Sequence, residues 1–134
     1  MKCGLCYAVK NKTPNRIYEL RSGVAFVSFD QKYEGWCVLA FKKHVQDMRE
    51  LSKEDYKDFW DDVKILANAI EKAFSCDKIN YAVLMNVSPH LHCHIIPRYK
   101  SDPDWGKDLW PRGKLIKEDK KAQLSIAEKI RKFL

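Results

Sequence analysis

Three histidines at intervals of two residues form the stretch of the sequence that is best suited to chemistry. His90, His92 and His94 lie in the run Pro-His-Leu-His-Cys-His-Ile-Ile-Pro-Arg-Tyr. Because a β-strand sends residues i, i+2 and i+4 to one face, the three imidazoles are expected to lie together. The intervening leucine, cysteine and isoleucine are apolar and would face the opposite way. The pattern therefore predicts a strand with one face in the core and a reactive group of histidines on the other.

Two kinds of chemistry use imidazoles arranged in this way. In the first, two or three of them bind a catalytic metal that activates water. In the second, one neutral imidazole attacks phosphorus while its neighbours orient it or contact phosphate oxygens. The first would normally need a further ligand or an orienting carboxylate, and no acidic residue lies in this strand. The second could draw its phosphate contacts from residues close in sequence, namely Lys42, Lys43, Ser88, His94 and Arg98.

The Cys-x-x-Cys pair at Cys3 and Cys6 is a second candidate site. Its spacing lets two thiolates reach one Zn²⁺ at about 2.3 Å, but it supplies only half of a tetrahedral site, and histidine is the usual partner. A degenerate knuckle without metal is an alternative. So is a thioredoxin-like redox pair, although that motif follows a strand and none is expected before Cys3. His44 ends an apolar strand beside two lysines, where a lone histidine is more often a surface residue.

Length and composition limit the class of protein. The 134 residues predict one domain, spanning 1–134, and the net charge of +7 favours anionic partners such as polyphosphates or nucleotides. Nucleic acid is an unlikely partner, because the aromatic residues are not interleaved with basic ones. No signal peptide and no stretch long enough to span a bilayer is found, so a cytoplasmic protein is expected. Five cysteines, three of them in apolar runs, predict buried thiols instead of a disulfide framework.

The other elements are expected to hold these residues in place. The clearest helix covers 52–73, with Ser52 as its N-cap and apolar residues at the spacing of one helix face. A second, basic helix covers about 117–134, with Leu124 on its apolar face. Between them, a loop from Asp102 to Arg112 with two tryptophans would either shape a substrate pocket or fasten itself to the body. Strands are predicted at 16–20, 24–29, 36–41 and 79–86, the last joined by a tight turn to the histidine strand.

These residues resemble a known family. The run from His90 to Ile96 matches the His-φ-His-φ-His-φ-φ signature of the histidine triad (HIT) family of nucleotide hydrolases and transferases. The longer run that ends in Pro-Arg-Tyr is similar to its bacterial diadenosine-tetraphosphate-hydrolase-like branch. The resemblance implies an α+β HIT-like fold, in which a five-stranded antiparallel sheet packs with one long helix and a C-terminal helix. It also implies a homodimer whose sheets join.

The resemblance also implies roles for single residues. His92 would attack the α-phosphate of a dinucleoside polyphosphate or related conjugate and form a nucleotidyl-histidine intermediate. His94 would contact phosphate and assist proton transfer to the leaving group. The substrate contacts would come from Asn86, Ser88, Asp30 and Arg98, with Asp30 as the candidate ribose contact. Here the loop before the triad is shortened to 86–89, which puts Ser88 one place nearer the first histidine than the usual hydroxyl.

The same resemblance completes the half metal site. It implies that His44 and His90 join Cys3 and Cys6 around a structural Zn²⁺, within an N-terminal zinc knuckle at 1–10. Two other functions stay open. The chain could be a nucleotide-binding regulatory protein with little turnover, or a metal-dependent hydrolase whose ligands are the three triad histidines.

Overall fold

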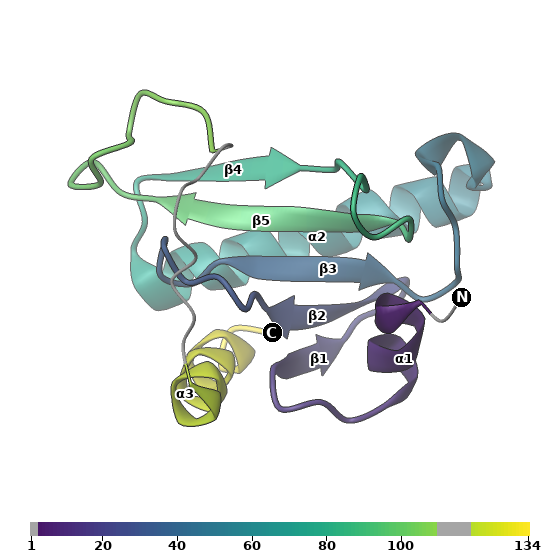
Figure 1. Cartoon of the computed structure of the whole chain (residues 1–134), viewed down its shortest axis with the longest axis horizontal. Helices are drawn as coiled ribbons and strands as arrows, with labels where there is room; N and C mark the ends of the chain where they lie inside the picture. Colours follow the sequence, from purple (N-terminus) through teal and green to yellow (C-terminus); the bar gives the residue numbers. More distant parts are fainter. Residues whose placement is uncertain (1–2, 110–118) are drawn as a thin grey trace.

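The centre of the molecule is an antiparallel sheet with the strand order β1-β2-β3-β5-β4 (Figure 1). The computed structural model describes residues 3–109 and 119–134. Within them the strands are β1 (Arg16–Glu19), β2 (Gly23–Val27), β3 (Cys37–Phe41), β4 (Lys78–Ala82) and β5 (His92–Arg98). The helices are α1 (Gly4–Lys10), α2 (Lys53–Phe74) and α3 (Lys120–Arg131), with a 3-10 turn, η1, at Met48–Glu50. This five-stranded α+β arrangement confirms the predicted fold class.

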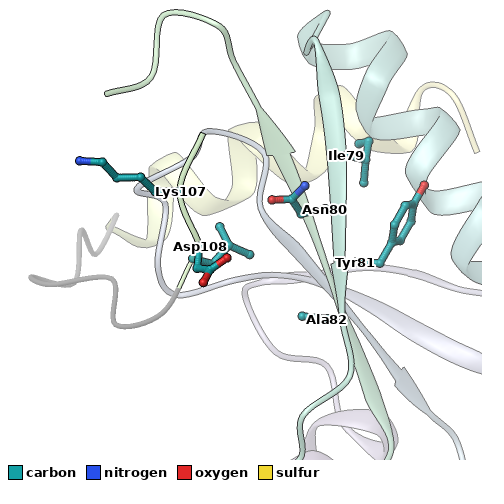
Figure 2. A pocket seen from close by; sticks show the side chains of 7 residues that line it. Ile79, Asn80, Tyr81, Ala82, Lys107 and Asp108 are labelled. Carbon is teal, nitrogen blue, oxygen red and sulfur yellow. The ribbon is translucent and has the colours of Figure 1, made fainter. Parts of the chain in front are cut away.

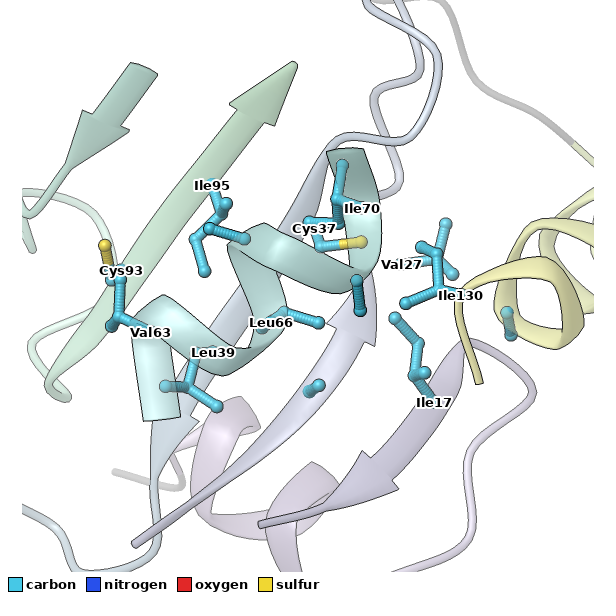
Figure 3. Packing of buried hydrophobic residues seen from close by; sticks show 14 of the residues in the cluster. Ile17, Val27, Cys37, Leu39, Val63, Leu66, Ile70, Cys93, Ile95 and Ile130 are labelled. Carbon is cyan, nitrogen blue, oxygen red and sulfur yellow. The ribbon is translucent and has the colours of Figure 1, made fainter. Parts of the chain in front are cut away.

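One face of the sheet packs against α2, and the main core lies between them (Figure 3). The predicted periodicity of α2 is confirmed, because the residues on its apolar face are buried: Phe59, Val63, Leu66, Ala67 and Ile70. They meet the sheet residues that face them, including Leu39, Cys93 and Ile95, each fully buried. Burial raises the pKa of the Cys93 thiol to about 12, so this cysteine serves as a core residue.

The alternation of β5 separates the core from the histidines. Leu91, Cys93 and Ile95 belong to the core beneath α2, as predicted. His92 and His94 therefore lie on the opposite face, where they pair with Ala40 and Val38 of β3. Because the pairing is antiparallel and regular, the neighbouring side chains of β3 and β5 share this face.

The segment between β4 and β5 differs from the prediction. A strand was expected over 79–86 with a tight turn into the histidines, but β4 ends at Ala82, and residues 83–91 form a longer connection. Met85 has φ of 57°, a left-handed conformation that a continuing strand does not allow. The register joins Ala82 to His94, so the two strands still form an antiparallel pair.

The two predicted helices are present with small differences. Ser52 caps α2, its hydroxyl accepting the Asp55 N–H at 3.0 Å. The C-terminal helix begins at Lys120, after Asp119 as its N-cap. The expected apolar face of α3 was wrong at Leu124, which is 45% exposed; the buried positions include Ile126, Ala127 and Ile130. The expected start of this helix at about 117 lies outside the described residues.

None of the described helices has an apolar stretch of the length that a bilayer requires. The cytoplasmic location stays a prediction. The five cysteines are free thiols, as expected, with Cys37 and Cys93 buried and Cys76 only partly so.

A buried carboxylate joins α2 to the hairpin between β1 and β2. Asp62 of α2 is 3% exposed and accepts two hydrogen bonds from Ser22, from the backbone N–H at 2.7 Å and from the hydroxyl at 2.6 Å. Removing the carboxylate would leave both donors without this partner, which is costly in a buried site.

We therefore predict that Asp62→Ala lowers the free energy of unfolding by about 2 kcal/mol in a urea titration. The matched control is Asp61→Ala, which removes a carboxylate from the adjacent, exposed position, where it pairs with Lys57. That surface pair contributes less than about 0.5 kcal/mol. Equal losses in the two variants would contradict the role of Asp62.

Candidate active site and adjoining metal site

The histidine face of the sheet is the face opposite α2. Two apolar clusters lie on either side of the histidines and cover the neighbouring strands. At one end, Leu5, Ala8 and Val9 from the N-terminal segment pack on β2 and β3, and α1 lies in front of the sheet while α2 lies behind it (Figure 1). At the other end, Leu109 packs with Trp36 and Ile96. His92 and His94 lie between these two clusters.

His90 stands just before β5 and turns toward the N-terminal segment. Its Nε2 lies 2.7 Å from the backbone oxygen of Phe41. A carbonyl oxygen can only accept, so Nε2 carries the proton and Nδ1 keeps a lone pair. That Nδ1 lies 3.5 Å from Cys3 Sγ and 3.4 Å from Cys6 Sγ. Burial lowers the pKa of His90, which favours the neutral ring that a metal ligand needs.

Cys3, Cys6, His44 and His90 form a group that can hold a metal ion. Their ligand atoms all lie within 4.8 Å of one another, and Cys6 Sγ is 3.3 Å from His44 Nδ1. Tetrahedral Zn²⁺ has bonds of about 2.3 Å to sulfur and about 2.1 Å to nitrogen, so its ligands lie roughly 3.3–3.8 Å apart. The observed sulfur–nitrogen separations match this geometry. The four residues therefore fit a tetrahedral metal with two thiolates and two imidazoles.

The fold supplies these four ligands from three places. Cys3 and Cys6 lie around the first turn of α1, His44 follows β3, and His90 precedes β5. Burial raises the pKa of the Cys6 thiol, and so does its contact with Cys3. A bound cation reverses this preference and favours the thiolate, so metal binding would release protons.

His92 has a single strong orienting contact. Its Nδ1 lies 2.6 Å from the backbone oxygen of His90. The carbonyl must accept, so Nδ1 is protonated, and in the neutral ring Nε2 keeps its lone pair. The residue is 8% exposed. A neutral imidazole held with an unprotonated Nε2 is the form that can act as a nucleophile.

His94 lies beside His92, with ring centroids 5.1 Å apart. It has a partner that the sequence analysis missed, because the Trp36 indole Nε1–H donates to its Nδ1 at 3.1 Å. Trp36 was assigned only to an apolar strand. The available signal was its position: it lies two residues before Val38, which pairs with His94, and a buried indole N–H needs an acceptor.

The guanidinium of Arg98 is engaged in intramolecular hydrogen bonds. Arg98 is 2% exposed and donates to Asp102 at 2.8 Å, to Asn80 Oδ1 at 2.9 Å and to the Asp104 backbone oxygen at 2.6 Å. Its guanidinium also lies 4.5 Å from the centre of the Tyr33 ring. These contacts show that Arg98 holds the loop after β5, and its role toward a substrate stays a prediction.

The other predicted substrate contacts are spread out. Asp30 is 2% exposed, and its Oδ1 accepts the Lys32 N–H at 3.0 Å. Asn86 is exposed and Ser88 is partly buried in the connection before the triad. The backbone oxygen of Ser88 accepts the His90 N–H at 2.8 Å. The roles of Asp30, Asn86 and Ser88 toward a substrate stay predictions.

A cavity of about 540 Å³ lies at the outer side of β4 (Figure 2). Its walls are residues 79–82 of β4 and residues 107–109 of the following loop. Since Ala82 pairs with His94, the cavity begins one strand away from the triad. Residues 107–109 belong to the loop predicted to shape a substrate pocket; Trp110 and the rest of that loop to Arg112 lie outside the described residues.

Comparisons with known proteins agree with this geometry. Residues 9–101 match the model of the HIT domain. The bis(5'-nucleosyl)-tetraphosphatase [asymmetrical] of Schizosaccharomyces pombe is 29% identical over 90 residues, which are 63% of this chain and 50% of that protein. The chain therefore spans half the length of that relative.

Two solved structures have the same fold. A histidine triad protein from Sinorhizobium meliloti superimposes with a TM-score of 0.82 at 25% identity, covering 89% of this chain and 88% of that one. A Zn-bound histidine triad family protein from Mycobacterium smegmatis superimposes with a TM-score of 0.76 at 18% identity, covering 98% of this chain and 91% of that one. The second likeness is one of fold alone.

The metal site gives a direct prediction. Cys6→Ser removes one of the four candidate ligands, so the purified variant is expected to contain less than about half of the wild-type metal per chain. Its melting temperature should also be lower, because metal binding contributes to folding. Metal content is measured by inductively coupled plasma mass spectrometry and melting by calorimetry.

The control is Cys76→Ser, which removes a thiol outside the four-ligand group. This variant should keep the wild-type zinc content. Full zinc content in Cys6→Ser would show that Cys6 is not a ligand.

Proposed function

The chain belongs to the histidine triad (HIT) family, and on that premise we propose that it is a nucleotide hydrolase or nucleotidyl transferase. The reaction is cleavage at the α-phosphate of a dinucleoside polyphosphate or a related nucleotide conjugate. The S. pombe relative supports this class of substrate, since its name describes a tetraphosphatase acting on such a compound. The net charge of +7 also suits a polyanionic substrate.

The observation that carries the proposal is the 2.6 Å contact between His92 Nδ1 and the His90 backbone oxygen. It leaves the Nε2 lone pair of His92 to attack the α-phosphorus. A P–N bond forms, and the P–O bond to the leaving group breaks, with its electron pair going to the departing oxygen. Water then attacks the same phosphorus, the P–N bond breaks with its electron pair returning to Nε2, and a proton of the water passes to solvent. These steps release a nucleoside monophosphate and the original imidazole. His94, 5.1 Å away between ring centroids, contacts the phosphate and assists departure.

We further propose that the metal is Zn²⁺ with a structural role. Two thiolates and two imidazoles at tetrahedral spacing are a usual zinc set. Four protein ligands leave no open position for water, so the ion would fasten α1 to the start of the catalytic strand. The Zn-bound family member from M. smegmatis is consistent with this assignment.

The rival metal-dependent hydrolase receives no support from the described residues. His90 has Nε2 on a carbonyl and Nδ1 toward the two thiols. His92 and His94 each have Nδ1 in a hydrogen bond, with a carbonyl and an indole respectively. The group of ligand atoms found close together is the Cys₂His₂ set, not the triad.

We also propose a homodimer in which β4 pairs with its copy. An edge strand presents unpaired backbone groups that favour such pairing, and both β1 and β4 lie at an edge. At β1, the backbone oxygens of Ile17 and Arg16 accept hydrogen bonds from Arg131 of α3, at 2.8 and 3.3 Å. At β4, Tyr81 is 53% exposed. The β4 edge is therefore the better candidate.

The nucleophile is tested by His92→Asn, which is expected to lower monophosphate release from diadenosine tetraphosphate by roughly 10³-fold or more. Zinc content and the circular dichroism spectrum should stay unchanged, because the substitution spares the metal ligands. Wild-type protein mixed with labelled substrate and quenched in base, which preserves the P–N bond, should carry one nucleotidyl group on His92 by mass spectrometry. The variant should carry none.

Turnover by His92→Asn within tenfold of wild type would remove His92 from this role. Nucleotide binding by the wild type without monophosphate release would instead favour the regulatory protein.

The dimer is tested by light scattering. Wild-type protein should have twice the chain mass of 15.8 kDa. Tyr81→Lys places a charge on the β4 edge and should shift the mass toward that of one chain. Tyr18→Lys, at the 45% exposed tyrosine of the opposite edge strand, is the matched control and should remain a dimer. A shift caused by Tyr18→Lys and not by Tyr81→Lys would place the interface at β1.

A further inference from the structure

The contact between Trp36 and His94 defines the protonation state of the second catalytic histidine. We propose that Trp36 is a positioning residue that keeps His94 neutral, with Nδ1 unprotonated and Nε2 protonated. His94 then stabilises the leaving oxygen through a hydrogen bond without transferring its proton, and the enzyme prefers phosphate-chain leaving groups over amines. This inference rests on the proposed function and names its leaving group.

The assignment follows from the hydrogen-bonding capacity of the two rings. An indole Nε1 can only donate, so the 3.1 Å contact requires His94 Nδ1 to accept. A neutral imidazole carries one N–H, which must then be on Nε2. In an imidazolium both nitrogens carry a proton, and Nδ1–H would face the indole N–H. The indole therefore favours one neutral tautomer over the other and over the cation.

Trp36 is held firmly enough to impose this choice. It is fully buried, and its ring meets the His94 ring edge-on, with centroids 5.7 Å apart. Its backbone N–H donates to Tyr33 at 3.1 Å. Its backbone oxygen accepts from the Ser28 N–H at 2.9 Å and from the Gln31 side chain at 2.8 Å. Rotation of the indole away from His94 would therefore require the surrounding turn to move.

A second set of contacts supports the indole from the side of the loop after β5. The Tyr33 ring lies 6.2 Å from that of Trp36. The Arg98 guanidinium covers the Tyr33 ring at 4.5 Å, and Asp102 holds Arg98 at 2.8 Å. The buried ion pair between Arg98 and Asp102 thus supports the stack that ends at His94.

The two catalytic histidines are consequently held in opposite tautomers. The backbone oxygen of His90 accepts from His92 Nδ1 at 2.6 Å, which leaves Nε2 of His92 with a lone pair. Trp36 donates to His94 Nδ1, which leaves Nε2 of His94 with a proton. One ring is prepared to attack, and its neighbour is prepared to donate a hydrogen bond.

The tautomer limits the leaving groups that His94 can assist. If neutral His94 gave up its Nε2 proton, the ring would become an imidazolate anion, which is unfavourable near neutral pH. A terminal phosphate oxygen leaves as a stable anion and needs only a hydrogen bond. An amine, in contrast, must receive a proton as its P–N bond breaks. The site therefore suits phosphoric anhydrides better than phosphoramidates.

The test compares two substrates with the same adenylyl group, diadenosine tetraphosphate and adenosine 5'-phosphoramidate. The wild type should have the higher kcat/KM for the tetraphosphate. Trp36→Phe keeps an apolar ring but removes the N–H, so kcat for the tetraphosphate should fall roughly tenfold, as expected for the loss of one neutral hydrogen bond. Without the indole N–H, His94 can become cationic and act as an acid. The kcat for the phosphoramidate should therefore fall by a smaller factor than that for the tetraphosphate, or rise.

The matched control is Trp60→Phe. Trp60 lies on α2, and its buried Nε1 has no hydrogen-bond partner among the described residues. Both substrates should be turned over at wild-type rates by this variant. An equal loss for both substrates in Trp36→Phe would reduce Trp36 to a packing residue and overturn the proposal.

An NMR measurement tests the tautomer independently of turnover. In ¹⁵N-labelled wild-type protein, two-bond correlations from the ring protons of His94 should show an unprotonated Nδ1 and a protonated Nε2. A protonated Nδ1 would overturn the inference even if the enzyme is active. If NMR shows the expected tautomer but the protein releases no monophosphate, the proposed function is wrong and the assignment of the tautomer stands.

Discussion

The hydrogen bond from His92 Nδ1 to the backbone oxygen of His90 is the contact on which the rest of the site depends. It joins two adjacent groups through one residue, because His90 directs its ring to the Cys₂His₂ group and its carbonyl to His92, the proposed nucleophile. The ring of His90 is fixed in turn by the Phe41 oxygen. A displacement of the N-terminal segment would therefore reach His92 through His90 alone, and a metal ion bound by the Cys₂His₂ group would help to fix the position of His92.

The sheet makes this arrangement possible because one of its faces packs in the core and the other carries the histidines. Alternate residues of β5 enter the core beneath α2, which immobilises the strand, and His92 and His94 lie between them on the opposite face. The facing strand β3 places Ala40 opposite His92 and Val38 opposite His94, and the indole of Trp36, just before β3, lies beside His94. The precision of the histidine positions is thus a property of the core on the other side of the sheet.

The sequence could predict what depends on local periodicity. The alternation around His92 and the helical periodicity of α2 were sufficient to predict these two elements and their buried faces, because each pattern indicates which side chains enter the core. The end of β4 was not predictable in this way, since it depends on the left-handed backbone at Met85. The contacts of Arg98 with Asp102 and of Trp36 with His94 were not predicted for a different reason: they are defined by how a loop and two strands meet in space.

The groups that orient the triad histidines carry no net charge. The rings of His92 and His94 are oriented by uncharged groups, a carbonyl and an indole, and residues 89–99 contain no carboxylate. An orienting carboxylate would place a negative charge beside an anionic substrate and raise the cost of binding it. The nearby loop does contain acids, but Asp102 pairs with Arg98 and Asp104 with Lys32 at 2.9 Å. In the proposed reaction, orientation by uncharged groups would let the two imidazoles approach a polyphosphate without a nearby negative charge, and the indole at position 36 extends that arrangement to His94.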